Sequence, residues 1–367
     1  MQATLQPKQT RHVVPTPYLQ QTAYWSRLKQ RQGSRTAAFD ILMDYDAGPD
    51  GDILVVLREI APDFTMAYVP SGPELLPDQE LRGPWLEDIS EKMRPYLPDN
   101  CVFIRYDLPW RSPWADEPDR YADNARWMGP PKTRVQEMRM NFDTEHWNLR
   151  KSPTDMLPPD TVLVDLSEDR DRILARMKPK TRYNIGLSGR KGVQVRDAGL
   201  EGLPAWYALY RKTAGRHGMA LNDLNYFRAA LKVYDRDCHS PARIHMLLAE
   251  VSGRPVAGII LAISGSRATY LYGASSSGYE DRGYMASYAL QWEAICRARE
   301  SGCRDYDMFG VSPAPDPDHP MYGLYRFKTG FGGRLQHRQG CWDYPFDEAR
   351  YDGYRAMELA DSPFASA

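Results

Sequence analysis

The sequence predicts an α/β protein made of two similar domains in tandem, with mixed, mostly antiparallel sheets flanked by helices. The length of 367 residues suits two domains better than one. A hydrophobic fraction of 42% is enough for two packed cores. The third observation is a repeat: three strands, a helix and one more strand occur twice, about 200 residues apart.

The second copy of the repeat is the clearer one. Apolar runs at Arg243–Val251 and Pro255–Ser264 are joined by Ser252-Gly253-Arg254, a short glycine-bearing link of the kind that closes a hairpin. The order then continues with a third strand, a helix and a last strand, expected at Ala268–Gly273, Tyr284–Glu300 and Arg304–Gly310.

The first copy shows the same order with a weaker pattern. Residues 1–16 are expected to form a loose tail, and Thr22–Gln30 a helix, because its apolar residues have helical spacing. The order as a whole is typical of N-acyltransferase, or GNAT-like, domains. The strands are expected at Ala37–Tyr45, Asp52–Ile60, Phe64–Pro70 and Cys101–Asp107, with a helix near Pro84–Pro95.

Two irregular segments mark the organisation of the chain. Asp107–Gly129 is rich in proline, tryptophan and charge, which predicts a long surface segment of a kind that is often functional. Ser152–Asp160 holds three prolines and predicts the boundary between a first domain at 1–158 and a second at 159–333. Residues 334–367 should return to complete the first domain, because Trp342 and Phe346 have no apolar partner left in the second. Two separate sheets are therefore expected.

The second domain should begin with a strand at Thr161–Leu166 and a helix from Ser167. That helix is expected to end in a basic cluster, Lys178, Lys180 and Arg182. Cations at the end of a helix would complement its dipole, which is the structural interpretation of the cluster.

Composition excludes several classes of protein. The net charge of −1 provides no global field for nucleic acid, so RNA would need a local patch. The five cysteines form no CxxC pair and the seven histidines no HxH or HxxxH spacing, so neither a disulfide framework nor a metal site is expected. The N-terminus lacks a secretory pattern and no apolar run approaches about 20 residues. A cytoplasmic, reducing location is expected.

Six segments, taken together and in this order, resemble the Fem family of peptidoglycan-bridge aminoacyltransferases. They span about residues 18 to 333, and the chain resembles the short members, which lack a helical arm. The segments are Tyr18-Leu19-Gln20 with Trp25 and Lys29, Tyr68–Pro73, Met177–Ile185 running into Lys191-Gly192-Val193, Tyr270–Ser275, Asp305–Gly310 and Phe327–Gly333.

The resemblance implies a function as well as a fold. Fem enzymes carry two acyltransferase-like domains and move an amino acid from aminoacyl-tRNA to the stem peptide of a peptidoglycan precursor. The implied partners are therefore charged tRNA, which acts as co-substrate without any further cofactor, and a nucleotide-linked or lipid-linked precursor. A peripheral contact with the inner face of the membrane is also expected, together with a role in cell-wall biogenesis and cell shape.

Five positions are candidates for precursor binding, and the resemblance selects four of them. Lys29 matches a lysine that contacts the diphosphate, although a solvated helix lysine is the plain alternative. Tyr226 and Asn222 occupy the places of a Tyr and an Arg, and Asn222 cannot supply the permanent charge. Arg216, six residues upstream of Asn222, could supply the missing charge.

The last two of the five positions are Tyr272 and Gly273. Strand alternation places Tyr272 on the same face as Tyr270, with Leu271 opposite. A tyrosine there is as readily a core aromatic as a substrate contact. The glycine would let a ligand approach the backbone closely.

The resemblance assigns the reacting centre to Lys328 and Phe327. A fixed cation would stabilise the tetrahedral oxyanion of aminoacyl transfer, or would bind the terminal adenosine phosphate. Phe327 offers a stacking face for a base, with burial under the loop as the alternative. Lys178, Lys180 and Arg182 are candidate RNA contacts.

Two other functions stay open. One is an acyl-CoA-dependent N-acyltransferase, which the imperfect pyrophosphate loop at residues 280–286 argues against. The other is a precursor-binding module without catalysis. A general base is not identified, and Asp307 is the best candidate among four carboxylates near the expected cleft, the others being Glu280, Asp281 and Asp305.

Overall fold

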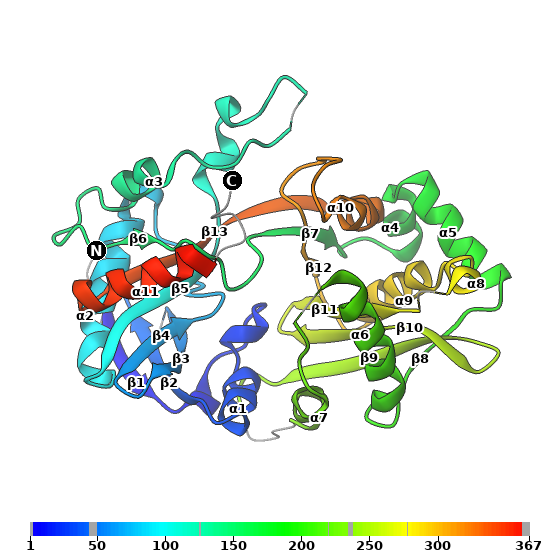
Figure 1. Cartoon of the computed structure of the whole chain (residues 1–367), viewed down its shortest axis with the longest axis horizontal. Helices are drawn as coiled ribbons and strands as arrows, with labels where there is room; N and C mark the ends of the chain where they lie inside the picture. Colours follow the sequence, from blue (N-terminus) through cyan, green and yellow to red (C-terminus); the bar gives the residue numbers. More distant parts are fainter. Residues whose placement is uncertain are drawn as a thin grey trace.

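The computed structural model describes residues 3–43, 50–124, 126–218, 220–233, 238–276 and 278–361. Two α/β halves lie side by side and share one path of strands (Figure 1). Within the described residues the order is β1-β2-β3-β4-β5-β13-β7-β12-β11-β10-β9-β8, with β6 paired to β13. The predicted fold class is confirmed. The two expected sheets are not separate, because β13 joins them.

The first half is an antiparallel meander closed by one parallel pair. Its strands are β1 (Thr4–Lys8), β2 (Arg35–Leu42), β3 (Gly51–Ala61), β4 (Phe64–Val69) and β5 (Cys101–Arg111), and only β4 and β5 run parallel. Helix α2 (Arg82–Met93) packs on one face of the sheet, and α1 (Ala23–Arg31) and α11 (Glu348–Asp361) pack on the other.

The expected loose tail is wrong for Thr4–Lys8, which forms the edge strand β1. Its residues pair in register with Leu42–Ala38 of β2. The end of the predicted strand Ala37–Tyr45 lies outside the described residues. The chain around these strands carries short 3-10 turns at Thr10–His12, Leu19–Gln21, Gln79–Leu81, Arg94–Tyr96, Pro113–Asp116 and Pro118–Arg120.

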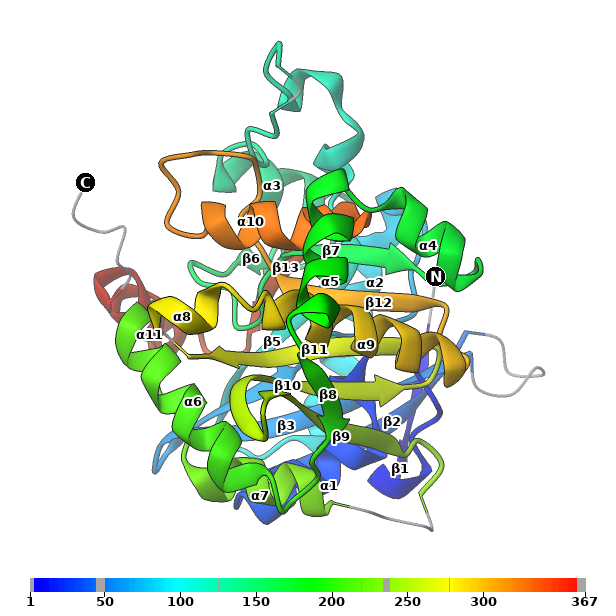
Figure 2. The same cartoon turned by 90° about the vertical axis from the view of Figure 1, so that its right-hand side faces the viewer.

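The second half repeats the arrangement (Figure 2). Helices α9 (Ala286–Glu300) and α5 (Pro179–Arg190) lie on one face, and α6 (Leu203–His217) and α7 (Leu224–Lys232) on the other. The three predicted strands of the hairpin region are confirmed. The strands are β7 (Asp160–Asp165), β8 (Gln194–Asp197), β9 (Ala242–Val251), β10 (Arg254–Ser264), β11 (Arg267–Ser275) and β12 (Asp305–Gly310).

Strand β13 (Arg334–Pro345) belongs to both halves. Its first residues, Arg334–His337, pair with β7, and its later residues pair with β5. Helix α11 follows and is fastened to the first half by Arg105. That buried guanidinium binds Asp343 and Glu358, each at 2.7 Å. The chain after residue 333 therefore connects the two sheets before it packs on the first.

Strands β11 and β12 separate along their length. They pair in parallel only over Arg267–Thr269 and Asp305–Asp307, whereas β4 and β5 stay paired from Thr65 to Val69. Among the described residues, the splay between the two parallel strands is thus greater in the second half.

A bulge in β11 overturns one prediction about the tyrosines. Ile260 of β10 pairs with Tyr272, and the next residue of β10, Leu261, pairs with Tyr270, so Leu271 is an extra residue. Tyr270 therefore packs on the α9 side of the sheet and Tyr272 on the α6 and α7 side. The expectation that they share a face is wrong, because the bulge shifts the alternation by one.

The predicted helix from Ser167 is also different. It is two helices: α4 (Arg170–Arg176), capped by the Asp169 side chain, and α5, which begins at Pro179. Proline suits the first turn of a helix because it lacks the N–H that would be unpaired there. The basic cluster therefore begins a helix and does not end one.

The remaining elements are short. None of the described helices combines the length and apolar character that crossing a bilayer requires. These elements are α3 (Thr133–Met140), β6 (Arg150–Lys151), α8 (Tyr279–Arg282), α10 (Tyr322–Lys328) and the 3-10 turn Thr329–Phe331.

Candidate active site

Helix α1 of the first half reaches across to the second half. The backbone N–H of Ala23 donates to the hydroxyl of Ser240 at 2.8 Å, and the hydroxyl of Tyr24 donates to the carbonyl of Ala230 at 2.8 Å. Leu28 is buried against this contact. This packing brings the end of α1 to helix α7.

Four of the predicted precursor-binding residues meet there. The Nζ atom of Lys29 lies 4.8 Å from the ring centre of Trp25 and 5.9 Å from that of Tyr226. The hydroxyls of Tyr226 and Tyr272 are 3.1 Å apart, and the amide of Asn222 donates to Tyr272 at 3.4 Å. Residues from α1, α7 and β11 thus form one cluster, called the tyrosine cluster below.

The electrostatics of the tyrosine cluster include a cation that the sequence interpretation missed. Burial lowers the pKa of Lys29, and the positive charge of Arg58 on β3 lowers it further. Arg58 is exposed, and its permanent charge acts on Lys29. Burial raises the pKa of Tyr226 and of Tyr272, so both hydroxyls stay protonated and can donate.

Two neighbouring residues differ from their predicted roles. Arg216 contacts Ser275, with its guanidinium 3.4 Å from the hydroxyl oxygen. A β-carbon on Gly273 would lie 1.8 Å from the hydroxyl of Tyr270. The glycine is therefore required by Tyr270, and the predicted close approach of a ligand is not needed to explain it.

Lys328 lies in the splay between β11 and β12. It is 4% exposed, and its ammonium donates to the carbonyls of Gly310 at 2.6 Å and Phe309 at 3.2 Å. The ring of Tyr270 is 5.3 Å away. Burial lowers the pKa of Lys328 to about 7, against the charge of Asp307, so the protonated and neutral forms are both populated near neutral pH.

Phe327 has a packing role. Its ring meets those of Tyr288 and Phe331 edge-on, with centroids 5.1 and 5.2 Å away. These contacts place Phe327 against the core of the second half, which is the burial that the sequence left open as an alternative.

Asp307 is poorly suited to act as a general base. Its oxygens accept from Thr161, from the backbone of Phe309 at 2.8 Å and from Arg338 at 2.7 Å. Burial opposes ionisation, but Arg338 and Arg267 hold the pKa of Asp307 below its usual range. Asp281 is paired with Arg254 and Asp305 with Arg267, and the side chain of Glu280 lies outside the described residues.

A second buried carboxylate was missed by the sequence interpretation. Asp107, within β5, accepts from the Tyr68 hydroxyl at 2.9 Å and from the Leu157 backbone at 3.0 Å. Burial raises the pKa of Asp107 to about 6. The charge of Arg338 acts on both Asp107 and Asp307.

The basic cluster lies beside the segment that carries Lys328. The backbone N–H of Lys178 donates to the carbonyl of Gly330 at 2.9 Å, and its Nζ to the hydroxyl of Thr329 at 3.2 Å. Arg182 donates to the carbonyls of Ala175 and Met177, and Lys180 is exposed.

The basic character continues along α5. Residues 178–191 hold five Lys or Arg and no Asp or Glu. Tyr183 is 61% exposed on the same helix, and the guanidinium of Arg190 lies 5.7 Å from the centre of its ring. In a chain whose net charge is −1, this is a strong local concentration of positive charge.

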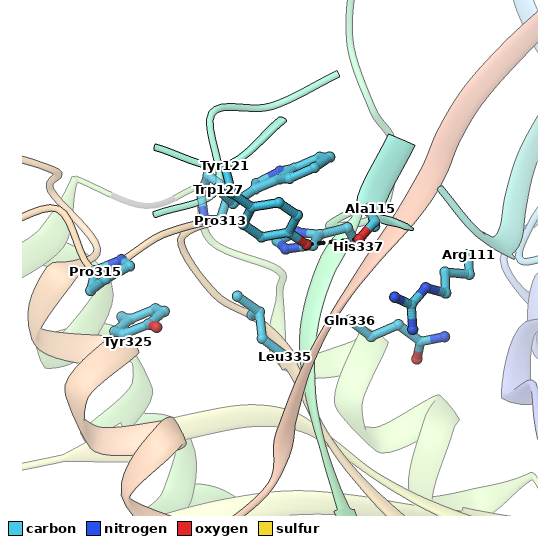
Figure 3. Close-up of a pocket in the computed structure, with 10 residues that line it drawn as sticks. All are labelled: Arg111, Ala115, Tyr121, Trp127, Pro313, Pro315, Tyr325, Leu335, Gln336 and His337. Atoms are coloured by element: carbon cyan, nitrogen blue, oxygen red, sulfur yellow. Dashed lines mark hydrogen bonds between the residues drawn. The ribbon is translucent and has the colours of Figure 1, made fainter. Parts of the chain in front are cut away.

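A hollow of about 210 Å³ opens on the other side of α10 (Figure 3). Trp127 stacks on His337 there, with ring centroids 4.5 Å apart, and Tyr325 belongs to the same helix as Lys328. One wall of the hollow is formed by the long irregular segment that follows β5. The sequence predicted that this segment is functional but did not predict a site there. The lining is Arg111, Ala115, Tyr121, Trp127, Pro313, Pro315, Tyr325, Leu335, Gln336 and His337.

The two groups of predicted residues lie on opposite sides of β11. The tyrosine cluster is on the side of α6 and α7, and Lys328 is on the side of α9. The structure thus offers one polar site between the halves and one buried cation within the second half.

Comparisons with known proteins found relatives of the chain. Lipid II:glycine glycyltransferase from Staphylococcus haemolyticus is 24% identical over 258 residues, which is 53% of this chain and 60% of that protein. The enzyme of the same name from Staphylococcus epidermidis is 23% identical over 255 residues, with the same coverage. The chain thus spans about three fifths of the length of these curated relatives.

A solved structure and a family match extend over more of the chain. The crystal structure of FemX superposes with a TM-score of 0.72 at 17% identity, covering 92% of this chain and 94% of FemX. Residues 11–252 and 247–359 match the FemAB family. With both halves of the chain matched, the protein belongs to the FemAB family.

Proposed function

We propose that the protein transfers an aminoacyl group from charged tRNA to an amine on the stem peptide of a peptidoglycan precursor. The observation that carries the proposal is the position of Lys328, a buried cation in a splay, next to the basic helix α5. The relatives named lipid II:glycine glycyltransferase support the acceptor class. The aminoacyl donor is the part of the proposal that the local charge of α5 supports.

The reaction forms an amide bond and breaks an ester. The amine nitrogen attacks the ester carbonyl, and the carbonyl oxygen takes up negative charge in the tetrahedral intermediate. The ammonium of Lys328 is suited to stabilise that oxygen because it is fixed by two carbonyls in a place from which water is excluded. The intermediate then collapses: the ribose oxygen leaves with a proton, and the amine nitrogen loses one.

The tyrosine cluster would hold the anionic part of the precursor. Lys29 and Arg58 supply two positive charges, and Tyr226 and Tyr272 supply protonated hydroxyls. A diphosphate presents oxygens to both kinds of donor. The site therefore suits a phosphate-bearing precursor, whether nucleotide-linked or lipid-linked.

Helix α5 would hold the acceptor end of the tRNA. Lys180 and Arg190 offer charge for phosphates, and the exposed ring of Tyr183 offers a face for a base. A β-carbon at Gly189 would meet no other atom, so the protein's own packing does not require this glycine. Glycine inside a helix costs about 1 kcal/mol relative to alanine, and close approach of an RNA backbone would account for it.

The test is a transfer assay with purified protein, a mixture of charged tRNAs and either a nucleotide-linked or a lipid-linked precursor. Mass spectrometry of the product should show a gain equal to one aminoacyl residue. Saturable turnover of acetyl-CoA, with no transfer from any charged tRNA, would support the acyl-CoA alternative instead. Precursor binding without transfer from either donor would favour the non-catalytic module.

A further inference from the structure

Two consecutive backbone carbonyls of β12 accept hydrogen bonds from the same ammonium. The Nζ atom of Lys328 donates to the carbonyl of Phe309 at 3.2 Å and to that of Gly310 at 2.6 Å. In a regular strand, successive carbonyls point to opposite sides, so a single donor cannot reach both of them. The backbone of β12 must therefore depart from regular geometry beside Lys328. We call these two groups the carbonyl pair.

The departure is a bulge in β12. Asp307 pairs with Leu163 of β7, and Gly310 pairs with Thr161, so β12 has one more residue than β7 between these two pairs. Phe309 lies inside the bulge and has a φ of 59°, in the left-handed region. A bulky residue rarely adopts this conformation unless the surrounding structure imposes it.

The carboxylate of Asp307 holds Phe309 in this conformation. Its Oδ1 atom accepts from the backbone N–H of Phe309 at 2.8 Å and from the hydroxyl of Thr161. A bond from an aspartate to the N–H two residues later closes a local turn of the chain. The Oδ2 atom accepts from the guanidinium of Arg338 at 2.7 Å. Because Thr161 and Arg338 belong to β7 and β13, two other strands hold the carboxylate in place.

The second carbonyl of the pair is held by the linker between the halves. A β-carbon on Gly310 would lie 2.7 Å from the Cγ atom of Pro158, so the linker packs directly on this backbone. The next residue, Val311, donates its N–H to the carbonyl of Asp160 at 3.1 Å. The chain is therefore fastened on both sides of the carbonyl pair.

The carbonyl pair determines the direction in which Lys328 can act. An ammonium has three N–H donors, and the pair takes two of them. In the part of the chain that the structure describes, no third group accepts from this ammonium. Two fixed N–H bonds of a tetrahedral nitrogen fix the third. A donor with a fixed direction is what stabilisation of an oxyanion requires.

We propose that Asp307 is a positioning residue: it holds Phe309 in the left-handed conformation, turns the carbonyl pair towards Lys328, and so aims the third N–H at the reacting carbonyl oxygen. The identity of that oxygen rests on the proposed function, whereas the geometry of β12 does not. The charge of Asp307 also favours the ammonium form of Lys328 against its burial. The carboxylate thus has a role other than that of a general base.

The first experiment replaces the carboxylate by an amide. In Asp307→Asn the side-chain oxygen should stay with Arg338, because a bond to a charged donor is the stronger one, and the NH₂ group then faces the N–H of Phe309. In the transfer assay kcat should fall about tenfold, with the KM for the precursor nearly unchanged, because the tyrosine cluster lies on the other side of β11. The matched control is Asp305→Asn on the same strand, which should leave kcat nearly unchanged.

The second experiment changes the backbone preference of the bulge. Glycine adopts the left-handed conformation without a supporting hydrogen bond, so Phe309→Gly added to Asp307→Asn should recover most of the lost kcat. Phe309→Val alone should lower kcat, because a β-branched residue resists this conformation. It keeps the pair of Asp307 and Arg338, so it tests the proposal even if Asp307→Asn does not fold. A loss in Asp307→Asn that glycine does not recover, or an unchanged kcat in Phe309→Val, would overturn the proposal.

A third measurement needs no substrate and separates this proposal from the proposed reaction. In crystal structures of Phe309→Val and Asp307→Asn, at least one carbonyl of the pair should lie farther than about 3.5 Å from the Nζ atom of Lys328. If both carbonyls stay bound in both variants, the proposal is wrong even where transfer occurs. If the carbonyls move but the unchanged protein transfers no aminoacyl group, the proposed function fails and the positioning of Lys328 by Asp307 is supported.

Discussion

Burying the ammonium of Lys328 costs free energy, and its hydrogen bonds to the carbonyls of Gly310 and Phe309 offset part of that cost. In the proposed reaction, the charge would have a catalytic use. The lowered pKa of Lys328 makes the role testable, because the ammonium and the amine would act in opposite ways near neutral pH.

The first prediction concerns catalysis by Lys328. Lys328→Met should lower kcat about a hundredfold, the usual loss for one oxyanion contact of about 3 kcal/mol, and leave precursor affinity nearly unchanged. If the ammonium is the active form, kcat of the unchanged protein should fall as pH rises through about 7. Rates measured from pH 6 to 9 check this, and a rate that rises through pH 7 would assign the lysine to proton abstraction.

The second prediction concerns stability at the same residue. Because the folded pKa is about 7 and the unfolded value is 10.5, the unfolded state binds more protons between these limits. The unchanged protein should therefore gain stability relative to Lys328→Met as pH rises from 7 towards 10. Urea unfolding of both proteins at several pH values measures the difference, and a constant difference would show that the lysine keeps an ordinary pKa.

The third prediction is the contrast at Lys29. Lys29→Met should raise the KM for a phosphate-bearing precursor roughly tenfold and hardly alter kcat at saturation, because a phosphate contact acts equally in the ground and transition states. Arg58→Met should behave in the same way, since Arg58 is the second cation of the cluster. Small, equal effects of the substitutions at Lys29 and Lys328 would indicate that both lysines have structural roles. A precursor-binding module would then be the better description of the protein.

At the scale of elements, α5 is the one whose role departs most from its sequence interpretation. A basic cluster that ends a helix complements its dipole, but one that begins a helix lies at the positive end and opposes it. The dipole of α5 therefore does not explain the cluster, although Arg182 binds carbonyls at the end of α4 and Lys178 binds Thr329. Lys180 has no such role, and the proposed contact with tRNA would account for its charge.

The fourth prediction tests α5 by charge removal. The double variant Lys180→Gln, Arg190→Gln should weaken tRNA binding about tenfold at 50 mM salt, because each lost phosphate contact reduces counterion release. The slope of log affinity against log salt should also fall by about two. Arg172→Gln on α4 is the control, since this side chain is 71% exposed and lies off the α5 face. A control variant that weakens binding equally would show that no defined surface is used.

Local pattern explains which elements could be predicted. The strands β9, β10 and β11 were found because long apolar runs are separated by tight turns, and α1 because Trp25 and Leu28 keep helical spacing. The edge strand β1 was missed because Thr4–Lys8 is stabilised by pairing with β2, which leaves little pattern in its own residues. The bulge at Leu271 was missed for the same reason, since it is set by the register with β10.

The candidate site was predictable only in part. Lys29, Tyr226 and Tyr272 were selected by resemblance to a family, and their meeting depends on α1 crossing to α7, a contact between residues about 200 positions apart. Arg58 and Asp107 could not be selected. Each is an ordinary strand residue in sequence, and only tertiary packing gives Arg58 a neighbouring lysine and Asp107 a raised pKa.

At the scale of the whole molecule, Arg105 fastens the end of the chain to the first sheet. Arg105→Met should lower the free energy of unfolding by roughly 3–5 kcal/mol, because it leaves Asp343 as a buried carboxylate without its cation. Denaturant unfolding followed by tryptophan fluorescence and by circular dichroism measures the loss. Arg94→Met, which removes a half-exposed cation from the same half, should change it by less than about 1 kcal/mol.

The strand shared by the two sheets has a consequence for substrate choice. Two stretches of β13 pair with β5 and with β7, and α1 also packs across to the second half. These contacts restrict hinge-like opening between the halves, and with it any change in the separation between Lys29 and the ammonium of Lys328. In the proposed reaction, that separation would decide which acceptors can react. It would select acceptors by the number of bonds between their phosphate and their amine, whatever the amino acid that is added.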